Sequence, residues 1–413
     1  MKLKIRLTVI IIAMMLVIIT AISTILLYRA RTLQKEAAEE NLENLTGRHA
    51  LDLMARLQQY YDSASSLAHI MNSYKRIEPD MRRTQFNECL ISVLESNPNY
   101  IGLYTVWKPG IIDGRDAEYA NTPGTDATGN YITWYYQESS SSSIELRAYE
   151  NYNDILTYIN NPALASIATI SNPEYWTLAG KQSLVISINV PIIMDDDKSV
   201  VGVVGVNVDL SPAQALIKEI VPYGNGYATM YANDGTIVAH PEVDRIGKKF
   251  QEVSLSTIGE KGLTAIEGSL KTGEPARVEY DNQLLQSYPF RVGNATTYWT
   301  IVARAYSATV LEAVTTMTKF TIIIAAIAVV AAAVIIFFVA TGITKPIVNV
   351  SLTLKDISEG EGDLTKSINV KSKDEIGDLA RYFNQTLEKI KNMVVIIKQQ
   401  AVALFDIGNE LAS

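Results

Sequence analysis

The chain has 413 residues, 48% of them hydrophobic and 19% charged, which is enough to build roughly two to three domains with buried cores. A formal net charge of -8, without a dense cluster of Lys and Arg interleaved with aromatic residues, excludes general affinity for nucleic acid. The single cysteine, Cys89, excludes an intramolecular disulfide and is predicted to be a small buried apolar residue.

Two uncharged apolar segments are predicted to cross a membrane. Residues 7–28 are long enough to span a bilayer of about 30 Å and, unlike a signal peptide, continue directly into a predicted helix. Residues 320–340 form the second crossing, so residues 29–319 make up a folded domain on one side of the membrane. Basic residues flank the first segment equally on both sides, so their count does not give the orientation.

Helices are predicted next along the chain, followed by short strands. Residues 29–75 contain no proline and repeat apolar residues near helical spacing, which predicts one long helix leaving the membrane. A second helix is predicted over residues 81–95. From residue 99 the pattern changes to β-rich runs separated by turn residues, beginning with a strand at residues 100–108.

Four aromatic residues occupy the stretch NYITWYYQ at residues 130–137. Alternation along a strand places Tyr131 and Tyr135 on one face and Trp134 and Tyr136 on the other. We therefore expect some of these rings to fill a core and others to line a pocket.

The remaining strands fall into two groups. Residues 182–193 and 200–208 form a predicted hairpin, and a second unit begins with a hairpin around the turn sequence NDG at residues 233–235. Further elements are predicted as strands at residues 226–231, 236–240, 276–280, 283–288 and 299–304, and as helices at residues 212–220 and 305–319.

The last part of the chain has the spacing of a coiled coil. Apolar residues step by four and three positions over residues 343–357 and again over residues 376–404, and Gly360 lies in the connector between them. Two such helices cannot bury their apolar seams alone, whereas two copies of the pair form a parallel four-helix bundle. The pattern therefore predicts a homodimer.

This last segment resembles a HAMP domain over residues 341–394. The resemblance rests on the sequences TGITKPIVNVSLTLKDISEGEGDL and KDEIGDLARYFNQTLEKI. It implies that Pro346 begins the first HAMP helix, that Glu375 lies where the second one begins, and that both residues serve signal relay.

Residues 29–319 resemble a double Cache extracellular sensor domain, through the sequences GNYITWYY, VPI, VVGVVGVNVDL and GYATMYANDGTIVAHPEVDRIGKK. With the two crossings, the layout is similar to that of a methyl-accepting chemotaxis receptor. The resemblance implies an α+β fold in which two PAS-like antiparallel-sheet units lie on the long helix. A distal unit at about residues 84–208 would bind a small solute, and a proximal unit at about residues 209–305 would pass the change on.

The resemblance also implies a location and partners. The sensor domain would lie outside the cell (inner) membrane, with residues 1–6 and the HAMP domain in the cytoplasm. We expect the sequence to be the N-terminal part of a longer receptor, in which residues 395–413 begin a signalling helix and the signalling hairpin is missing. The implied partners are a second copy of the chain and a cytoplasmic kinase and adaptor.

Several ligand-binding residues follow from the same resemblance. Trp134 and Tyr135 match a Trp-Tyr pair of the Cache receptors for free amino acids, whereas Ile132 stands where those receptors have an arginine. An arginine clamps the ligand carboxylate with two parallel hydrogen bonds, and isoleucine cannot do so. We therefore expect a neutral or cationic organic solute in place of an ordinary amino acid.

The other candidate ligand residues are polar or aromatic. Glu174 and Trp176 stand at the later Tyr and Asp positions of the family, and Asn207 stands at the position of its last Asp. Tyr149 and Tyr152 are two further aromatic candidates.

Two other hypotheses stay open. In the first, the same sensor belongs to a histidine kinase or nucleotide cyclase whose output domain is missing. In the second, the chain is a membrane-anchored surface enzyme or adhesin. His49, His69 and His240 are far apart in the sequence and lack the spacing of metal ligands, so we expect no enzyme activity, no metal and no cofactor.

Overall fold

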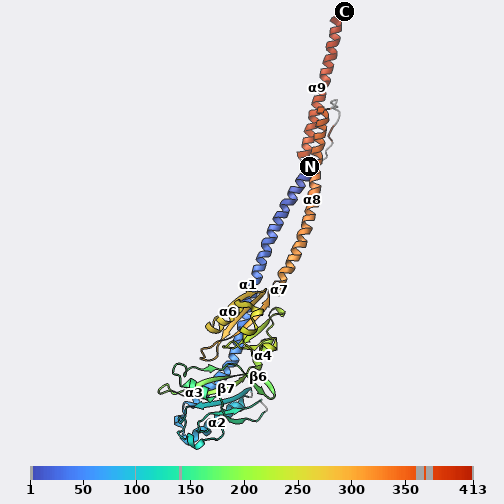
Figure 1. The fold of residues 1–413 in the computed structure, drawn as a ribbon. Coiled ribbons are helices and arrows are strands. Elements are labelled where there is room, and N and C mark those ends of the chain that lie inside the picture. Colours follow the sequence, from blue (N-terminus) through green and yellow to red (C-terminus); the bar gives the residue numbers. More distant parts are fainter. Residues whose placement is uncertain (1–2, 98, 139–141, 360–366, 369–374, 412–413) are drawn as a thin grey trace. The chain divides into compact units, whose positions relative to one another are not determined.

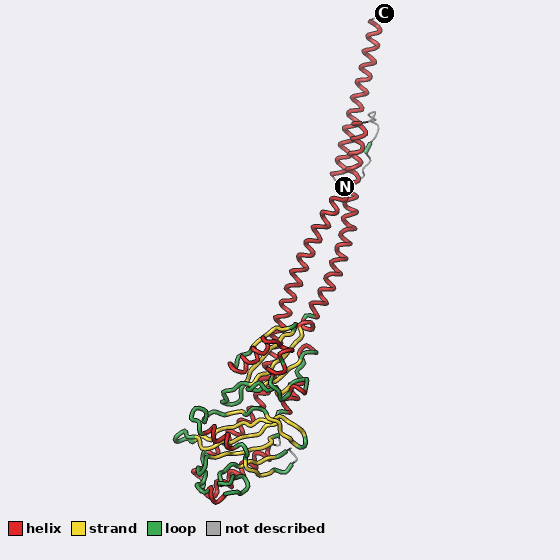
Figure 2. The backbone as a smooth tube through the Cα atoms, in the orientation of Figure 1, coloured by secondary structure: helices red, strands yellow, loops and turns green. Residues whose placement is uncertain are grey.

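The structure is a computed structural model that describes residues 3–97, 99–138, 142–359, 367–368 and 375–411. The chain divides into two compact units, one of residues 32–313 and the other of residues 1–31 with 314–413. The first unit contains both β-sheets, and the described part of the second is built from long helices (Figure 1, Figure 2). The predicted α+β fold is therefore confirmed.

Three long helices carry the apolar segments and the coiled-coil pattern. They are α1 (Leu3–Met71), α8 (Glu312–Glu359) and α9 (Glu375–Leu411). Both α1 and α8 contain a stretch long and apolar enough to cross a membrane. The predicted connector around Gly360 lies outside the described residues.

Two predicted helix boundaries near the second crossing were wrong. The helix expected over residues 305–319 is interrupted at Leu311, between α7 (Ser307–Val310) and α8. Pro346 does not begin a helix, because α8 runs through it. A proline inside a helix removes one backbone hydrogen bond and its ring crowds the carbonyl four residues earlier, which kinks the helix or breaks it, and here the helix continues past the proline.

The first sheet has seven antiparallel strands in the order β3-β2-β1-β7-β6-β4, with β5 also paired to β6. Its strands are β1 (Tyr100–Trp107), β2 (Thr133–Tyr136), β3 (Glu145–Ala148), β4 (Thr169–Ile170), β5 (Glu174–Leu178), β6 (Lys181–Ile193) and β7 (Val200–Asp209). The predicted hairpin of β6 and β7 is confirmed. We call this sheet, with α2 (Arg82–Ser96) and α3 (Tyr152–Ile159), the seven-stranded unit.

The second sheet has five strands in the order β10-β11-β12-β8-β9. Its strands are β8 (Tyr227–Tyr231), β9 (Ile237–Ala239), β10 (Ala276–Tyr280), β11 (Gln283–Phe290) and β12 (Trp299–Tyr306). The predicted hairpin around NDG is confirmed as β8 and β9. With α4 (Ser211–Lys218), α5 (Phe250–Val253) and α6 (Leu255–Thr272), this sheet forms the five-stranded unit.

Short 3-10 helices occupy several of the connections. They are η1 (Tyr74–Arg76), η2 (Pro79–Met81), η3 (Asp116–Tyr119), η4 (Pro222–Gly224) and η5 (Val243–Arg245). The segment between β9 and α6 contains η5 and α5, and it is important for the contact between the two sheet units described below.

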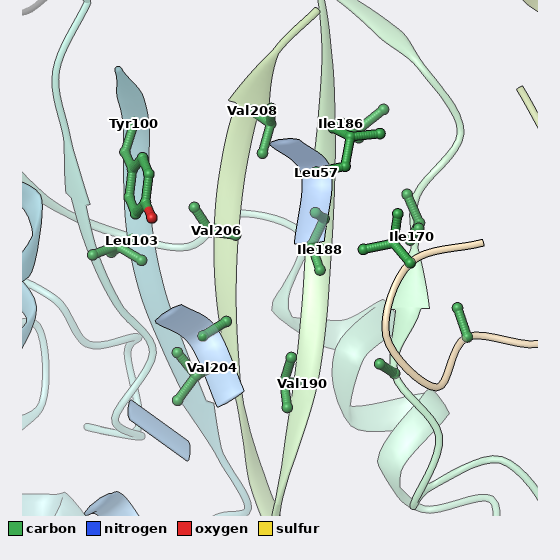
Figure 3. Packing of buried hydrophobic residues seen from close by; sticks show 14 of the residues in the cluster. Leu57, Tyr100, Leu103, Ile170, Ile186, Ile188, Val190, Val204, Val206 and Val208 are labelled. Atoms are coloured by element: carbon green, nitrogen blue, oxygen red, sulfur yellow. The ribbon is translucent and has the colours of Figure 1, made fainter. Parts of the chain in front are cut away.

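Helix α1 provides a common core for both sheets. Its buried residues between Ala50 and Met71 belong to one apolar cluster that includes Val206 of β7 in the first sheet and Ile301 of β12 in the second. Figure 3 shows Leu57 of α1 among inward-facing residues of the first sheet, namely Ile186, Ile188, Val190, Val204, Val206 and Val208. Both sheets therefore pack one face against α1, and the opposite faces pack against other helices, α3 on the first sheet and α6 on the second.

Candidate ligand-binding site

The alternation along β2 and the residues just before it separates the aromatic side chains of residues 131–136, as the sequence predicted. Tyr131 and Tyr135 belong to the core cluster beside α1 and α2. Trp134 and Tyr136 belong to a different cluster, on the face of the seven-stranded sheet that α3 covers. The candidate site lies on this second face.

A pocket of about 260 Å³ opens on this face. Strands β4, β5 and β6 form one side, and α3 with the segment before it forms the other. Its aromatic and charged lining residues are Tyr149, Asp154, Tyr158, Glu174 and Trp176, and Thr169, Ser171, Ser187 and Asn189 add polar groups. Aromatic walls with a few convergent polar groups are typical of a site for a small organic molecule.

A buried hydrogen-bonded chain supports the pocket from behind. Trp134 donates from Nε1 to Oδ1 of Asn207 at 2.9 Å. Asn207 in turn donates from Nδ2 to Oγ of Ser187 at 2.9 Å, and Ser187 lines the pocket. Because Asn207 is fully buried, both ends of its amide need partners, and these two residues supply them.

Stacked rings form the second support. Tyr104 of β1 stacks on Tyr149 with ring centroids 3.8 Å apart. Trp134 meets Tyr149 and Trp176 edge-on, at centroid distances of 6.0 and 5.9 Å. Burial, and then the neighbouring Tyr149, raise the pKa of Tyr104, so its hydroxyl stays protonated and donates to Asn189.

The structure brings together six of the seven predicted ligand residues. Tyr149, Glu174 and Trp176 line the pocket, and Trp134 and Asn207 lie directly behind it. Tyr152, at the start of α3, is half-buried and packs against the same apolar cluster.

Tyr135 does not reach this pocket. Because it follows Trp134 directly in an extended strand, its side chain points to the other face of the sheet. There it lines a separate pocket of about 550 Å³ with Ile91 and Leu94 of α2. Burial, with a smaller effect of Glu88, raises the pKa of Tyr135 to about 12. We therefore leave Tyr135 out of the candidate site.

Sequence reasoning missed several lining residues. Asp154 and Tyr158 are four residues apart on α3, so they share one helix face, but α3 was not predicted. Asn189 lies in the apolar run of β6, where a buried amide signals a network or a ligand.

The charge of the pocket is negative. Asp154 and Glu174 are the charged residues among the described residues that line it, and this described lining contains no lysine, arginine or histidine. Among the described residues, no group of three or more His, Cys, Asp and Glu side chains is placed to hold a metal ion. The pocket can therefore hold a neutral or cationic group, which the aromatic faces of Tyr149 and Trp176 also favour.

The two predicted relay residues lie in the other compact unit, where the structure describes α8 and α9. Pro346 lies inside α8, and Glu375 is exposed at the first position of α9. Val350 of α8 and Ala380 of α9 are buried together with Ile368. The backbone of Ile368 is held by the Asn384 side chain, through hydrogen bonds of 2.8 and 2.9 Å.

Comparison with known families and proteins agrees with this architecture. The model of the Cache domain matches residues 30–314, and the model of the HAMP domain matches residues 338–392. The methyl-accepting chemotaxis protein TlpQ of Pseudomonas aeruginosa is 23% identical over 337 residues, which cover 74% of this chain and 46% of that protein. PctB of the same organism, also a methyl-accepting chemotaxis protein, is 28% identical over 207 residues, which cover 50% of this chain and 32% of PctB.

A solved structure shares the fold of residues 32–313, the compact unit that contains both sheets. It is the extracellular domain of a protein described as a histidine kinase, mmHK1S-Z2, with 22% identity and a TM-score of 0.56. The match covers 67% of this chain and 99% of that domain. The chain thus spans between about a third and about half of the length of the two curated relatives, and nearly all of the solved domain.

Proposed function

The chain belongs to the Cache domain family, whose model covers residues 30–314, and from this premise we propose that it is the sensing and relay part of a chemotaxis receptor. In this proposal a small extracellular solute binds in the pocket of the seven-stranded unit. The second crossing and the HAMP domain at residues 338–392 pass the change to a cytoplasmic chemotaxis output. Similarity to TlpQ and PctB, both methyl-accepting chemotaxis proteins, supports this output.

The observation that carries the proposal is the pocket on the α3 face of the seven-stranded sheet. Its walls are aromatic, the two charged residues among its described lining are carboxylates, and its volume of about 260 Å³ suits a metabolite-sized solute. A cation placed against Trp176 or Tyr149 gains a cation–π interaction, and Glu174 adds a favourable charge. We therefore assign an organic cation, such as an amine, as the preferred solute, and a neutral analogue as the weaker one.

Membrane anchoring follows from the composition of α1 and α8. Their apolar side chains are exposed to the surroundings, as Val17 and Ile335 illustrate with 69% and 62% exposure. Exposed apolar residues on all sides of a helix are stable in hydrocarbon and unstable in water. We propose that both helices cross the cell membrane, with residues 32–313 outside and the HAMP domain inside.

The unburied coiled-coil seam supports a homodimer in this proposal. Two of the seam residues, Val350 and Leu387, are buried within one chain. Seven others are exposed, namely Ile343, Leu354, Leu379, Ile390, Val394, Ile397 and Leu404. A second copy of the same two helices would cover these residues in a parallel four-helix bundle.

The solute is tested by calorimetric titration of the 413-residue chain in lipid nanodiscs with primary amines, diamines and quaternary ammonium compounds, and with their neutral analogues. We expect at least one cation to bind, and Trp176→Ala to weaken its binding at least tenfold. Tyr135→Phe, on the other face of the sheet, is the matched control and should bind as the wild type does. Binding of a solute that Trp176→Ala leaves unchanged would place its site elsewhere and contradict the proposal.

A further inference from the structure

A buried arginine of the five-stranded unit has no carboxylate partner among the described residues. Arg304 of β12 is only 1% exposed. Its Nη1 donates to the hydroxyl of Tyr227, and the guanidinium lies 4.9 Å from the centre of that ring. Its Nε and Nη2 atoms are buried and donate to none of the described residues. An uncompensated charge in a protein interior is strongly unfavourable, so an anion beside the guanidinium would stabilise this arrangement.

A second buried arginine in the chain shows how such a charge is normally matched. Arg83 of α2 is 5% exposed, and its Nε and Nη2 atoms donate to the two carboxylate oxygens of Asp113 at 2.7 and 3.2 Å. The same Nη2 also donates to Asp116. The edge of Arg304 that lacks partners is the edge with which Arg83 binds a carboxylate, and its two parallel N–H groups fit two carboxylate oxygens.

His240 contributes another donor beside Tyr227. Its ring centre lies 5.6 Å from that of Tyr227, and its Nδ1 accepts a hydrogen bond from the backbone N–H of Glu242 at 2.9 Å. In neutral histidine the proton must then be on Nε2, which is buried and has no partner among the described residues. Burial, and then Arg245, lower the pKa of His240 to about 4, so the ring is neutral near pH 7.

The nearby charges do not compensate Arg304. Arg245 is already paired with Glu242 at 2.8 Å, so this pair contributes little net charge. Glu242 is largely exposed, and Arg304 has no salt bridge to any described Asp or Glu. Two more buried hydroxyls on the same face of β8, those of Thr229 and Tyr231, also have no described partner. The region around Arg304 therefore carries one net positive charge, together with several buried polar groups that have no hydrogen-bond partner among the described residues.

The position of this cluster parallels that of the pocket in the other sheet. Arg304 pairs with Tyr227 across β12 and β8, as Asn207 pairs with Gly102 across β7 and β1. In each sheet these residues lie on the face away from α1, because their neighbours Ile301, Ala303, Val206 and Val208 pack on the α1 side. Both sheets therefore place buried polar groups on the face that points away from α1.

We propose that the five-stranded unit holds a second binding site, for a small monocarboxylate, formed by Arg304, Tyr227 and His240. The carboxylate accepts two hydrogen bonds from Nε and Nη2 of Arg304, and the neutral Nε2–H of His240 donates a third. This site binds the opposite charge to the pocket of the seven-stranded unit, and it does not depend on that pocket.

Sodium acetate is the probe, added to the 413-residue chain in lipid nanodiscs, with sodium chloride at matched ionic strength as the reference. We expect acetate to raise the Tm of the wild-type chain with increasing concentration, and chloride to have no comparable effect. Arg304→Met should abolish the acetate response. Because it removes an unpaired buried charge, it should leave the Tm without acetate unchanged or higher.

Three further variants sharpen the test. Tyr227→Phe and His240→Gln should each weaken the apparent affinity for acetate at least threefold. Arg277→Met removes an exposed arginine of β10 that pairs with Glu39 and Glu43, and it should keep the full response. An acetate response that survives Arg304→Met would overturn the proposal. A wild-type Tm that acetate raises no more than chloride, with a lower Tm for Arg304→Met, would make Arg304 a purely structural residue.

Discussion

Tyr175 of the seven-stranded unit donates from its hydroxyl to the backbone carbonyl of Ile246, in the five-stranded unit, at 2.9 Å. Its ring also covers Gly247, where a Cβ atom would come within 2.5 Å of the ring. Tyr175 lies on β5 between Glu174 and Trp176, which point into the pocket. One strand therefore carries pocket residues on one face and the contact to the second sheet on the other.

This contact predicts that Tyr175 restrains the segment at residues 245–248 of the five-stranded unit. Tyr175→Phe keeps the ring on Gly247 but removes the hydrogen bond to Ile246, which is worth about 1 kcal/mol. We expect amide exchange at residues 245–248 to become roughly fivefold faster, with solute affinity unchanged. Hydrogen-exchange mass spectrometry checks this, and Thr177→Val on the same strand is the control. Equal exchange in wild type and Tyr175→Phe would show that the contact does not restrain the segment.

The buried amide of Asn207 should be essential for stability. Asn207→Ala leaves Nε1 of Trp134 and Oγ of Ser187 without their partner, and each unsatisfied buried group costs about 1–3 kcal/mol. We expect a fall in Tm of several degrees, measured by scanning calorimetry. Asn225→Ala, which removes an exposed amide bonded to Thr309, should change the Tm by much less. A small effect of Asn207→Ala would mean that the chain behind the pocket contributes little.

The carboxylates of the pocket should set its charge preference. Glu174→Gln removes a negative charge from an exposed position, so the loss of affinity for an organic cation should be modest, about three- to tenfold. The loss should shrink as salt is added, because exposed charges are screened. Glu145→Gln, on β3 and paired with Arg147, is the control. If Glu174→Gln weakened the binding of a neutral solute as much as that of the cation, an electrostatic role of Glu174 would be contradicted.

Much of the fold could be predicted from local patterns. The hairpin of β6 and β7 was predictable because its Val and Ile runs flank a polar turn, and the β8–β9 hairpin because NDG favours a tight turn. Helix α6 could not be predicted, because Gly259, Gly262 and Gly268 weaken its helical signal. It forms because its apolar residues, Ile258 and Ile266 among them, pack on the five-stranded sheet.

The sites were predictable only in part. Trp134 and Asn207 came from the motif, but their hydrogen bond to each other depends on the pairing of β2, β1 and β7, which single-sequence patterns do not specify. The sequence predicted that Arg304 lies in a strand, but it did not indicate a function for this residue. Its position between Ala303 and Ala305 in an apolar strand was the available signal, since a buried cation needs a partner.

The exposed seam of α8 and α9 predicts where two copies meet. In a Cys89→Ser background, Leu354→Cys should form disulfide-linked dimers in membranes, because exposed seam residues face their counterparts across the bundle axis. Lys355→Cys, one residue further and also exposed, should crosslink much less. Non-reducing gel electrophoresis after mild oxidation measures both. Monomeric Leu354→Cys, or equal crosslinking of the two variants, would contradict the four-helix bundle.

His240 should make the stability of the sensor unit depend on pH. Its pKa is about 4 in the folded chain, against 6.5 in the unfolded chain, because burial, Arg245 and Arg304 disfavour the charged form more than Glu242 favours it. Between these two values the unfolded chain binds a proton that the folded chain does not, so stability falls as the pH drops from 6.5 towards 4. Above pH 6.5 His240 is neutral in both states and contributes no pH dependence.

The expected loss from this residue is up to about 2 kcal/mol at pH 5. His240→Gln cannot take up the proton, so its Tm should fall less than that of the wild type between pH 7 and pH 5, as calorimetry would show. Acetate bound to Arg304 would place a negative charge beside His240 and raise the pKa of His240. Acetate should therefore reduce the difference in Tm loss between the wild type and His240→Gln. Parallel Tm profiles for wild type and His240→Gln would mean that His240 titrates normally, and hence that its ring is not shielded from water and charge as the structure indicates.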